Sequence, residues 1–397
     1  MSRLRWHDAA VNLAAHPIAW PLARAIRRVG GVVRVPGLGM VINDAETAHD
    51  ILTRDDLFTK NGHGSISESM TVLFGPSALG NMDGESHRVL RAKLAGVVSA
   101  DRAAELLSAC APAIATLQRE LASGHTVDLV AWMRLLSGRI TLDMLGIAPS
   151  AGAGDAQCLE LVALGERIVS GFDLQPSAAW LDRARTDAAH FADQVRVGFE
   201  RADAPPGSFV RRLRDAGFSF DEARGVVSVL FIAGTLTTAA ALPRIVALLV
   251  DGGHLAALGA RPDAVTGAIS EGLRYSTPVP ATVRIARRDT DVGGQRVRAG
   301  ERLLILTCNT ARDAALFPEP DRFDPARPHN PRARYLWYGA GPHFCLGFPV
   351  AQAQLDLVIR ALLELPGTLR VVRRRAARGV VVPRYARLDV RVERSGS

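Results

Sequence analysis

The chain has 397 residues, of which 48% are hydrophobic and 22% charged, and it carries a formal net charge of +8. This composition excludes an intrinsically disordered chain, a collagen-like repeat and a small disulfide-stapled scaffold. No shift in composition marks a boundary along the sequence, so we expect residues 1–397 to form one large domain.

The positive charge is spread along the chain and consists almost entirely of arginine. Only Lys60 and Lys93 are lysines among the 48 Lys and Arg residues. The densest basic run, from Arg373 to Arg378, is short. The charge therefore favours a basic face for an acidic protein partner over nucleic-acid binding.

Cysteine spacing and the N-terminal segment indicate the compartment. The four cysteines, at positions 110, 158, 308 and 345, are far apart and form no CxxC pair. This spacing argues against zinc ribbons, c-type haem attachment and a disulfide framework. The segment from Trp6 to Val29 contains charged residues and two prolines, so we expect neither a signal peptide nor a membrane anchor. A reducing cytoplasm fits these features.

The first half of the chain is predicted to be mainly helical. An N-terminal amphipathic helix is followed by β-rich runs at residues 32–35 and 40–42, which a Pro- and Gly-containing turn joins into a hairpin. Asp44 is the expected N-cap of a helix ending at Leu52, and Asp101 that of a helix ending at Leu121. Further helical patterns occupy residues 128–147, 156–171, 178–202, 207–215, 221–250 and 262–275.

From Pro278 onward the pattern changes to short β runs. They lie at about residues 282–287, 295–298, 302–306 and 379–393, and one helix at about 346–364 interrupts them. The predicted fold class is therefore mostly α with a minor β portion.

Residues 225–243 are uncharged and long enough to cross a bilayer. However, Ser228, Thr235, Thr237 and Thr238 lie within the stretch. A helix that is apolar on all sides also occurs at the centre of large soluble proteins. We therefore interpret this segment as a core helix and expect no membrane association.

The most informative segment runs from Tyr338 to Gly347 and reads YGAGPHFCLG. Gly339 and Gly341 permit a tight turn with positive φ, and Gly347 lets a flat group approach the backbone just after Cys345. The apolar run that follows has helical spacing and would place Cys345 at a helix N-terminus, which favours a thiolate. A thiolate at such a position is a metal ligand or a nucleophile. The nucleophile interpretation is weaker, because no histidine is obviously placed as its base.

This segment resembles the haem-binding loop of the cytochrome P450 family, whose pattern is F-x-x-G-x-(H/R)-x-C-x-G. Tyr338 stands for the phenylalanine, and Gly341, His343, Cys345 and Gly347 match. The resemblance implies a cytochrome P450-like fold and haem b as the cofactor, with Cys345 as the axial ligand of its iron. Gly339 and Gly347 would then contact the haem as parts of this loop.

Two further motifs occur in the order that the family shows. Glu271 and Arg274 form E-x-x-R, which alone is usually a solvated surface pair. Residues 323–327, FDPAR, resemble a second segment of the family. Its arginine, here Arg327, completes a buried network under the loop that contains Cys345, residues 338–347, which we call the cysteine loop. Loss of one partner from such a network would cost about 3–5 kcal/mol.

The resemblance also assigns cations to the two haem propionates. They are His87 and Arg91 in H-x-x-x-R, Arg284 in a predicted strand, and His343 in the cysteine loop. Each would act through charge-assisted hydrogen bonds.

Residues 233–238, AGTLTT, resemble the family's central helix pattern A-G-x-(D/E)-T-(T/S). The resemblance makes Gly234, Thr237 and Thr238 candidate catalytic residues. Gly234 would leave space for dioxygen, and the Thr237 hydroxyl would organise water. A threonine in a helix more often bonds back to its own i−4 carbonyl, the alternative for Thr238. Leu236 replaces the acid that helps deliver protons, and an aliphatic side chain cannot relay a proton.

The resemblance implies a haem-thiolate monooxygenase that oxidises an apolar or aromatic small molecule of secondary metabolism with O₂. Substrate contacts are expected from residues 61–81, 230–238, 279–283 and 380–382. The named candidates are Leu230, Ala233, Val279, Ala281 and Val283.

Electrons would come from an acidic ferredoxin or flavodoxin-type donor with its reductase. Arg332 and Arg334 are candidates for the docking face, where Gln352 replaces an arginine common in the family. Because Leu236 departs from the pattern, a peroxygenase or oxidative-coupling enzyme is the alternative function. A haem-binding protein without catalysis is a third possibility.

Overall fold

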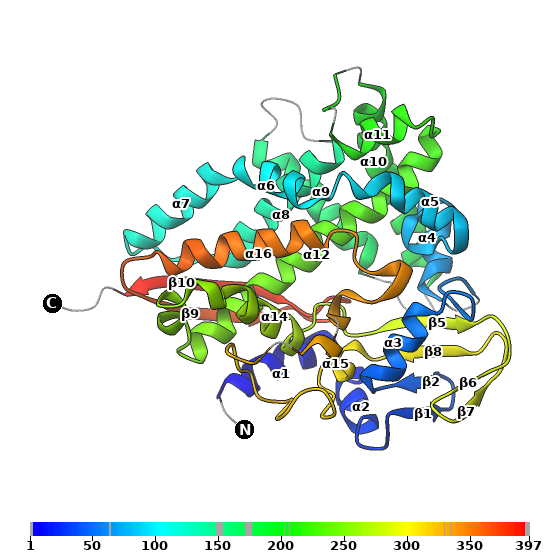
Figure 1. Cartoon of the computed structure of the whole chain (residues 1–397). Helices are drawn as coiled ribbons and strands as arrows, with labels where there is room; N and C mark the ends of the chain where they lie inside the picture. Colours follow the sequence, from blue (N-terminus) through cyan, green and yellow to red (C-terminus); the bar gives the residue numbers. More distant parts are fainter. Residues whose placement is uncertain are drawn as a thin grey trace.

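The computed structural model describes residues 3–62, 65–147, 154–170, 177–201, 203–205, 207–328, 330–333 and 335–393. Within these ranges, helices dominate and short strands form small sheets, which confirms the predicted fold class. Figure 1 shows the helices over the upper and left parts of the molecule and the largest sheet at the lower right.

The helices follow the predicted order closely. The α-helices are α1 Arg3–Ala15, α2 Ala19–Ile26, α3 Ala45–Thr53, α4 Ile66–Phe74, α5 Gly84–Ala95, α6 Ala100–Ser108, α7 Ala111–Ala122, α8 Leu129–Leu145, α9 Gly154–Val169, α10 Ala178–Glu200, α11 Phe209–Asp215, α12 Phe220–Asp251, α13 Leu255–Gly259, α14 Val265–Tyr275, α15 Thr307–Thr310 and α16 Phe348–Leu363. Short 3₁₀ helices are η1 Leu79–Asn81, η2 Pro262–Ala264, η3 Pro331–Ala333, η4 Leu336–Tyr338 and η5 Gly341–His343.

The strands form a five-stranded sheet in the order β1-β2-β8-β5-β3, a three-stranded sheet β4-β10-β9 and a hairpin β6-β7. Strand β2 runs parallel to β8, and the other pairs are antiparallel. Their bounds are β1 Val32–Val35, β2 Gly39–Ile42, β3 Phe58–Thr59, β4 Val127–Asp128, β5 Thr282–Ala286, β6 Thr290–Val292, β7 Gln295–Val297, β8 Arg302–Ile305, β9 Thr368–Ala376 and β10 Tyr385–Glu393.

Helix α12 crosses the middle of the helical part and packs against α8, α9, α10, α14 and α16 (Figure 1). A capping box between Ser219 and Glu222 begins the helix. It is long and apolar enough to cross a membrane, but 67% of its most apolar window is buried inside the structure. Burial on nearly all sides is what a core helix shows.

Of the two helices with a predicted N-cap, one is confirmed and the other differs in the structure. Asp44 caps α3 as expected, accepting a hydrogen bond from the Thr47 amide at 2.8 Å. Asp101 is not a cap: Ser99 caps α6, and the predicted helix to Leu121 is divided into α6 and α7. Pro112 lies in the first turn of α7, where its missing N–H is tolerated, whereas it could not continue α6.

The N-terminal and C-terminal segments also differ from expectation. The single predicted N-terminal helix is two helices, α1 and α2, separated at residues 16–18, which include Pro17. The predicted strand at 379–393 begins only at Tyr385, and its partner β9 was not predicted. Strand β9 contains Arg373, Arg374 and Arg375 of the basic run, whose side chains alternate between exposed and half-buried positions, and Arg378 follows the strand.

Candidate active site

The cysteine loop joins η4 to α16. Gly339 and Gly341 have φ angles of 79° and 63°, as the sequence predicts. A Cβ at Gly341 would lie 2.6 Å from the Leu52 carbonyl oxygen, so this glycine also lets the loop approach the end of α3. The amide of Cys345 donates to the Tyr338 carbonyl at 3.0 Å, which closes the loop. Cys345 then lies two residues before Gly347, the N-cap of α16.

Burial raises the pKa of the Cys345 thiol, although the Gly347 and Phe348 amides and the charge of Arg91 oppose this effect. The helix N-terminus therefore lies where the sequence predicts, but the polypeptide alone does not favour a thiolate. A cation bound to sulfur would supply the missing stabilisation. The other three cysteines are buried, and burial raises the pKa of each.

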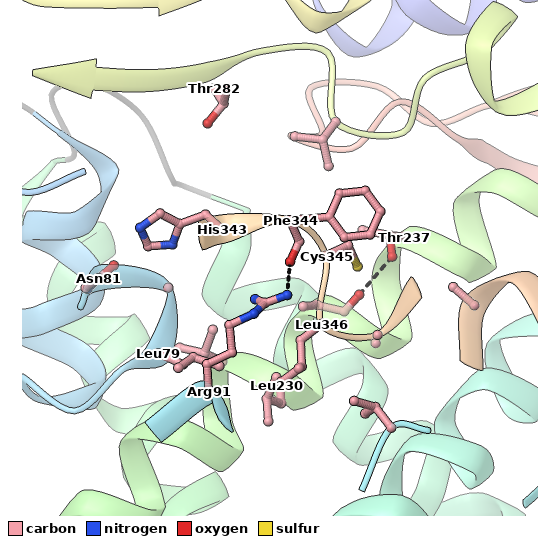
Figure 2. Close-up of a pocket in the computed structure, with 18 of the residues that line it drawn as sticks. Leu79, Asn81, Arg91, Leu230, Thr237, Thr282, His343, Phe344, Cys345 and Leu346 are labelled. Atoms are coloured by element: carbon pink, nitrogen blue, oxygen red, sulfur yellow. Dashed lines mark hydrogen bonds between the residues drawn. The ribbon is translucent and has the colours of Figure 1, made fainter. Parts of the chain in front are cut away.

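Cys345 lines a cavity of about 470 Å³ whose wall also includes residues of α12, among them Leu230 and Thr237 (Figure 2). Apolar side chains from α4, α8, α12 and the cysteine loop make up much of its wall, including those of Met70, Met144 and Leu346. Among the described residues, no Asp or Glu lines it. Such a cavity suits an apolar ligand held by a few polar groups.

All five predicted substrate contacts line this cavity. They are Leu230, Ala233, Val279, Ala281 and Val283. The predicted segment 61–81 also contributes, through residues between Ser65 and Asn81. Residues 380–382 do not, because they lie beside α1, where the Val381 carbonyl accepts from His16.

The candidate residues of α12 reach the cavity in different ways. The Thr237 hydroxyl donates to the Ala233 carbonyl at 2.8 Å, and its lone pairs remain available as acceptors (Figure 2). The Thr238 hydroxyl donates to the Gly234 carbonyl at 2.9 Å and is buried. Thr237 is thus the more accessible of the two hydroxyls.

Gly234 and Leu236 take positions that the motif did not predict. A Cβ at Gly234 would lie 2.9 Å from Thr141 Oγ1, so the glycine permits close packing of α12 against α8. Gly234 and Thr141 both line the cavity, so space for dioxygen beside this glycine stays a prediction. Leu236 is 5% exposed and does not line the cavity.

Basic side chains gather at one end of the cavity. Arg91, on α5, donates from Nη2 to the Phe344 carbonyl, a bond that Figure 2 shows. His343 Nε2 lies 3.1 Å from Asp83 Oδ1, and the rings of His87 and His343 are 4.2 Å apart. Of the predicted propionate partners, Arg91 and both histidines line the cavity.

Arg284 and Gly339 do not line the cavity. Arg284 is 4% exposed, and its Nη1 donates to Val283 O at 2.8 Å. Burial lowers its pKa to about 10. Its positive charge therefore acts on the cavity from a buried position behind the lining residues.

Both histidines are predominantly neutral at pH 7. Burial lowers the pKa of His343 to about 4, despite its bond to Asp83, and lowers that of His87. For Asp83, burial alone would raise the pKa, but hydrogen bonds from His343 and Thr59 outweigh it and lower the pKa to about 2. The permanent positive charge here comes from the arginines, and Lys60 adds a charge that depends on pH.

Lys60 lines the same end of the cavity and was not predicted. Burial, with the charges of Arg284 and Arg91, lowers its pKa to about 7, which Asp83 partly opposes. Two nearby arginines and this lysine exceed the single carboxylate Asp83, so the cluster would be neutralised by added carboxylates. A lone lysine after a two-residue strand carries no motif that could have identified it.

The buried carboxylate network forms as predicted. Arg274 Nε and Nη2 donate to the two oxygens of Glu271 at 2.6 and 2.9 Å, and Arg327 Nε donates to Glu271 Oε2 at 3.0 Å. The remaining donors of both arginines bond carbonyls of residues 311–322. The network thereby fixes the segment that leads to the cysteine loop.

The site fits haem on three observations. A Cβ at Gly347 would meet no atom within 4 Å, and its φ of −81° suits any residue, so neither packing nor backbone explains the glycine. The space belongs to the cavity and would admit a flat ring. The basic end would hold two carboxylates.

The third observation is that the described residues offer a metal at Cys345 few further protein ligands. No group of three or more His, Cys, Asp or Glu suited to a metal occurs among the described residues. A metal at Cys345 must therefore bring most of its own ligands, as a porphyrin does.

On the expected docking side, Arg332 is exposed, and Arg334 lies outside the described residues. The Gln352 amide nitrogen is buried without a hydrogen-bond partner. The hydroxyl of Tyr338, which replaces the family's phenylalanine, is also buried and unpartnered.

Comparisons with known proteins place this arrangement in a family. The family model described as Cytochrome P450 matches residues 264–365. Cytochrome P450 105A3 of Streptomyces carbophilus is 30% identical over 260 residues, which are 63% of this chain and 60% of that protein. The 20-oxo-5-O-mycaminosyltylactone 23-monooxygenase of Streptomyces fradiae is 34% identical over 178 residues, 44% of this chain and 41% of that enzyme.

These alignments span from 32% to 60% of the length of the curated relatives. The crystal structure of P450BioI in complex with an acyl carrier protein gives a TM-score of 0.81 at 21% identity, covering 97% of this chain and 100% of that one. The fold is therefore shared over nearly the whole chain. The family model also spans the residues that build the cysteine loop, so the comparisons together support a member of the cytochrome P450 family.

Proposed function

We propose that the protein is a haem-thiolate monooxygenase that oxidises an apolar or aromatic small molecule. The observation that carries this proposal is the placement of Cys345 at the wall of a largely apolar cavity, with the Thr237 hydroxyl on the same cavity. Haem b, when bound through Cys345, supplies the iron at which O₂ is activated.

The chain's own residues would bind and orient the haem. Cys345 would ligate the iron, and Gly347 would leave room for the ring. Arg91 and Lys60 would pair with the propionates, with Arg284 adding charge from behind. His87 would contribute a neutral N–H donor, because its pKa is lowered. The single N–H of neutral His343 already donates to Asp83, so His343 would hold that carboxylate in place.

Thr237 would position a water for proton transfer at the part of the cavity wall that α12 forms. Its hydroxyl donates to the Ala233 carbonyl, so its oxygen can accept a hydrogen bond from a water in the cavity. With no Asp or Glu among the described lining residues, protons would reach this water from solvent or from a substrate group. Cavity size and apolar lining support an apolar or aromatic substrate, such as one from secondary metabolism.

Electrons would come from an acidic ferredoxin or flavodoxin-type protein with its reductase, in the cytoplasm. The net charge of +8 and the exposed Arg332 support an acidic partner. A relative's structure holds an acyl carrier protein. A carrier-bound substrate is therefore included in the substrate screen below.

A peroxygenase or oxidative-coupling enzyme is the second candidate. Buried Leu236 and the acid-free described lining favour it, because peroxide already carries the electrons and protons that O₂ would need. The third possibility, a haem-binding protein without catalysis, predicts haem spectra without product.

Turnover tests these functions. The haem-loaded protein is screened with free and carrier-bound compounds, using either NAD(P)H with ferredoxin and reductase or hydrogen peroxide. Product with the electron donor supports the monooxygenase, and product with peroxide alone supports the second candidate. Ligand-induced Soret shifts without product under either condition contradict both.

A further inference from the structure

Two residues that line the cavity, Ser65 and Asn81, each have one buried side-chain atom without a hydrogen-bond partner: Ser65 Oγ and Asn81 Oδ1. Ser65 is 5% exposed and Asn81 is 4% exposed. A buried polar atom without a partner costs about 1–3 kcal/mol, so each such atom requires an explanation. Both residues line the cavity, and a ligand group that reaches these atoms would satisfy them.

The hydrogen bonds of Asn81 determine which end of its amide is free. Its Nδ2 donates to the Ser67 carbonyl at 2.9 Å and to Thr71 Oγ1 at 3.1 Å. A carbonyl oxygen only accepts, so the nitrogen must face Ser67 and the amide oxygen must face away from it. Figure 2 shows Asn81 among the residues that line the cavity. The free atom is therefore an acceptor, which needs a donor from the ligand.

Ser65 departs from its usual role at a helix start. It is the N-cap of α4, where a serine hydroxyl commonly accepts a hydrogen bond from an amide of the first turn. Here the side chain makes no such bond, although the Ser65 carbonyl accepts from the Glu68 amide at 3.1 Å. The hydroxyl can therefore donate to or accept from a ligand.

The surrounding charges select the kind of ligand group. A carboxylate would be repelled by the acceptor oxygen of Asn81. A cationic amine would be repelled by Lys60 and Arg91, which line the same cavity. A neutral hydroxyl or amide N–H satisfies the Asn81 oxygen without either penalty.

We infer that Ser65 and Asn81 are specificity-determining residues that bind a neutral hydrogen-bond donor, such as a hydroxyl, on an otherwise apolar substrate. This inference rests on the proposed function and narrows its substrate class. It predicts that apolar molecules lacking a donor bind less tightly than their hydroxylated analogues.

The test uses haem-loaded protein and a panel of bicyclic probes, including phenylcyclohexanol, its methyl ether and phenylcyclohexane. Affinities are measured by calorimetry and by Soret shifts. The wild-type protein should bind the alcohols about 3- to 10-fold more tightly than the matched ethers and hydrocarbons. A panel in which no alcohol is preferred contradicts the inference.

Variants distinguish a direct role of Ser65 and Asn81 in ligand binding from an effect on folding. Ser65→Ala and Asn81→Leu should each reduce or abolish the preference for alcohols while leaving hydrocarbon affinity within about twofold. Ser69→Ala is the matched control, because Ser69 is buried in α4 but does not line the cavity. Since Asn81→Leu also removes the bonds to Ser67 and Thr71, its folding is checked by circular dichroism, and Ser65→Ala decides if it fails to fold.

Failure of the inference is distinguishable from failure of the proposed function. If the protein binds no haem, no Soret band appears with any probe, which contradicts the proposed function. If the Soret band is present and Ser65→Ala leaves the alcohol preference unchanged, only the inference is contradicted.

Discussion

The side-chain hydroxyls of Ser137 and Thr238 lie 3.1 Å apart and connect helix α8 to α12. Gln354, on α16, donates from Nε2 to Ser137 Oγ at 3.2 Å. All three side chains are buried. The chain of hydrogen bonds therefore ties the helix after Cys345 to the helix over the cavity, and it uses Thr238 as a structural group.

Thr237 and Thr238 are predicted to respond differently to the same substitution. Thr238→Val removes a buried partner of Ser137 and should lower the free energy of unfolding by about 1–3 kcal/mol. Thr237→Val should change it by about 0.5 kcal/mol or less, because this half-buried hydroxyl bonds only its own helix.

Urea denaturation measures the stabilities, and product formed per O₂ consumed measures coupling. Thr237→Val should release more peroxide, whereas folded Thr238→Val should remain coupled. Equal uncoupling in the two variants would contradict the assignment of roles.

The network around Glu271 is predicted to be a major source of stability. Glu271→Gln leaves Arg274 and Arg327 without their carboxylate, at a cost of about 3–5 kcal/mol. Glu319→Gln is the control, because its pair with Arg322 is exposed and worth about 1 kcal/mol or less. Denaturant unfolding of both variants compares the costs. Equal costs would show that burial does not matter here.

Lys60 is predicted to destabilise the haem-free protein and to stabilise the haem-bound one. Its pKa is about 7 in the folded chain and 10.5 in the reference state, so the unfolded chain binds the proton more tightly. Lys60 destabilises the folded, haem-free chain most below pH 7, where it is protonated in both states. This destabilisation decreases as the pH rises from 7 toward 10.5.

Haem-free Lys60→Met should therefore unfold at a higher temperature than wild type at pH 7, with the difference shrinking toward about pH 9. The haem-bound variant should lose haem about 10-fold faster, as measured by transfer to apomyoglobin. Lys93→Met, at an exposed position, is the control. Haem loss at the wild-type rate would exclude Lys60 from propionate binding.

Alanine substitutions at two glycines of the cysteine loop are predicted to have different effects, one on haem binding and the other on stability. Gly347→Ala places a methyl group in the cavity, so it should weaken haem binding while haem-free stability stays the same or rises by about 0.4–1 kcal/mol. Gly341→Ala combines a φ of 63° with a 2.6 Å contact and should destabilise the protein with or without haem. Haem titration and thermal unfolding distinguish the cases; undiminished haem affinity in Gly347→Ala would contradict the proposed ring position.

The sequence predicted the parts of the site that depend on local spacing. Positive φ at Gly339 and Gly341, the position of Cys345 before α16 and the Glu271–Arg274 pair all follow from neighbouring residues. The resemblance extended this to Arg327, which is distant in sequence.

Features that depend on packing between distant elements could not be predicted. Gly234 packs against Thr141 on another helix. The lowered pKa of Lys60 depends on its burial and on the charges of Arg284 and Arg91, which are distant in sequence. Ser99 and Asp101 are both good caps by residue type, so the choice required the structure. Ser65 and Asn81 are ordinary polar residues until their burial is known.

The central claim is that the sulfur of Cys345 ligates a haem iron, and the absorption spectrum of the reduced carbon monoxide complex tests it most directly. Wild-type protein and Cys110→Ser, whose cysteine is buried away from the cavity, should both show the red-shifted Soret band of thiolate-ligated haem. Cys345→Ser should lose that band. A wild-type protein that binds no haem, or a Cys345→Ser variant that keeps the red-shifted band, would contradict the account.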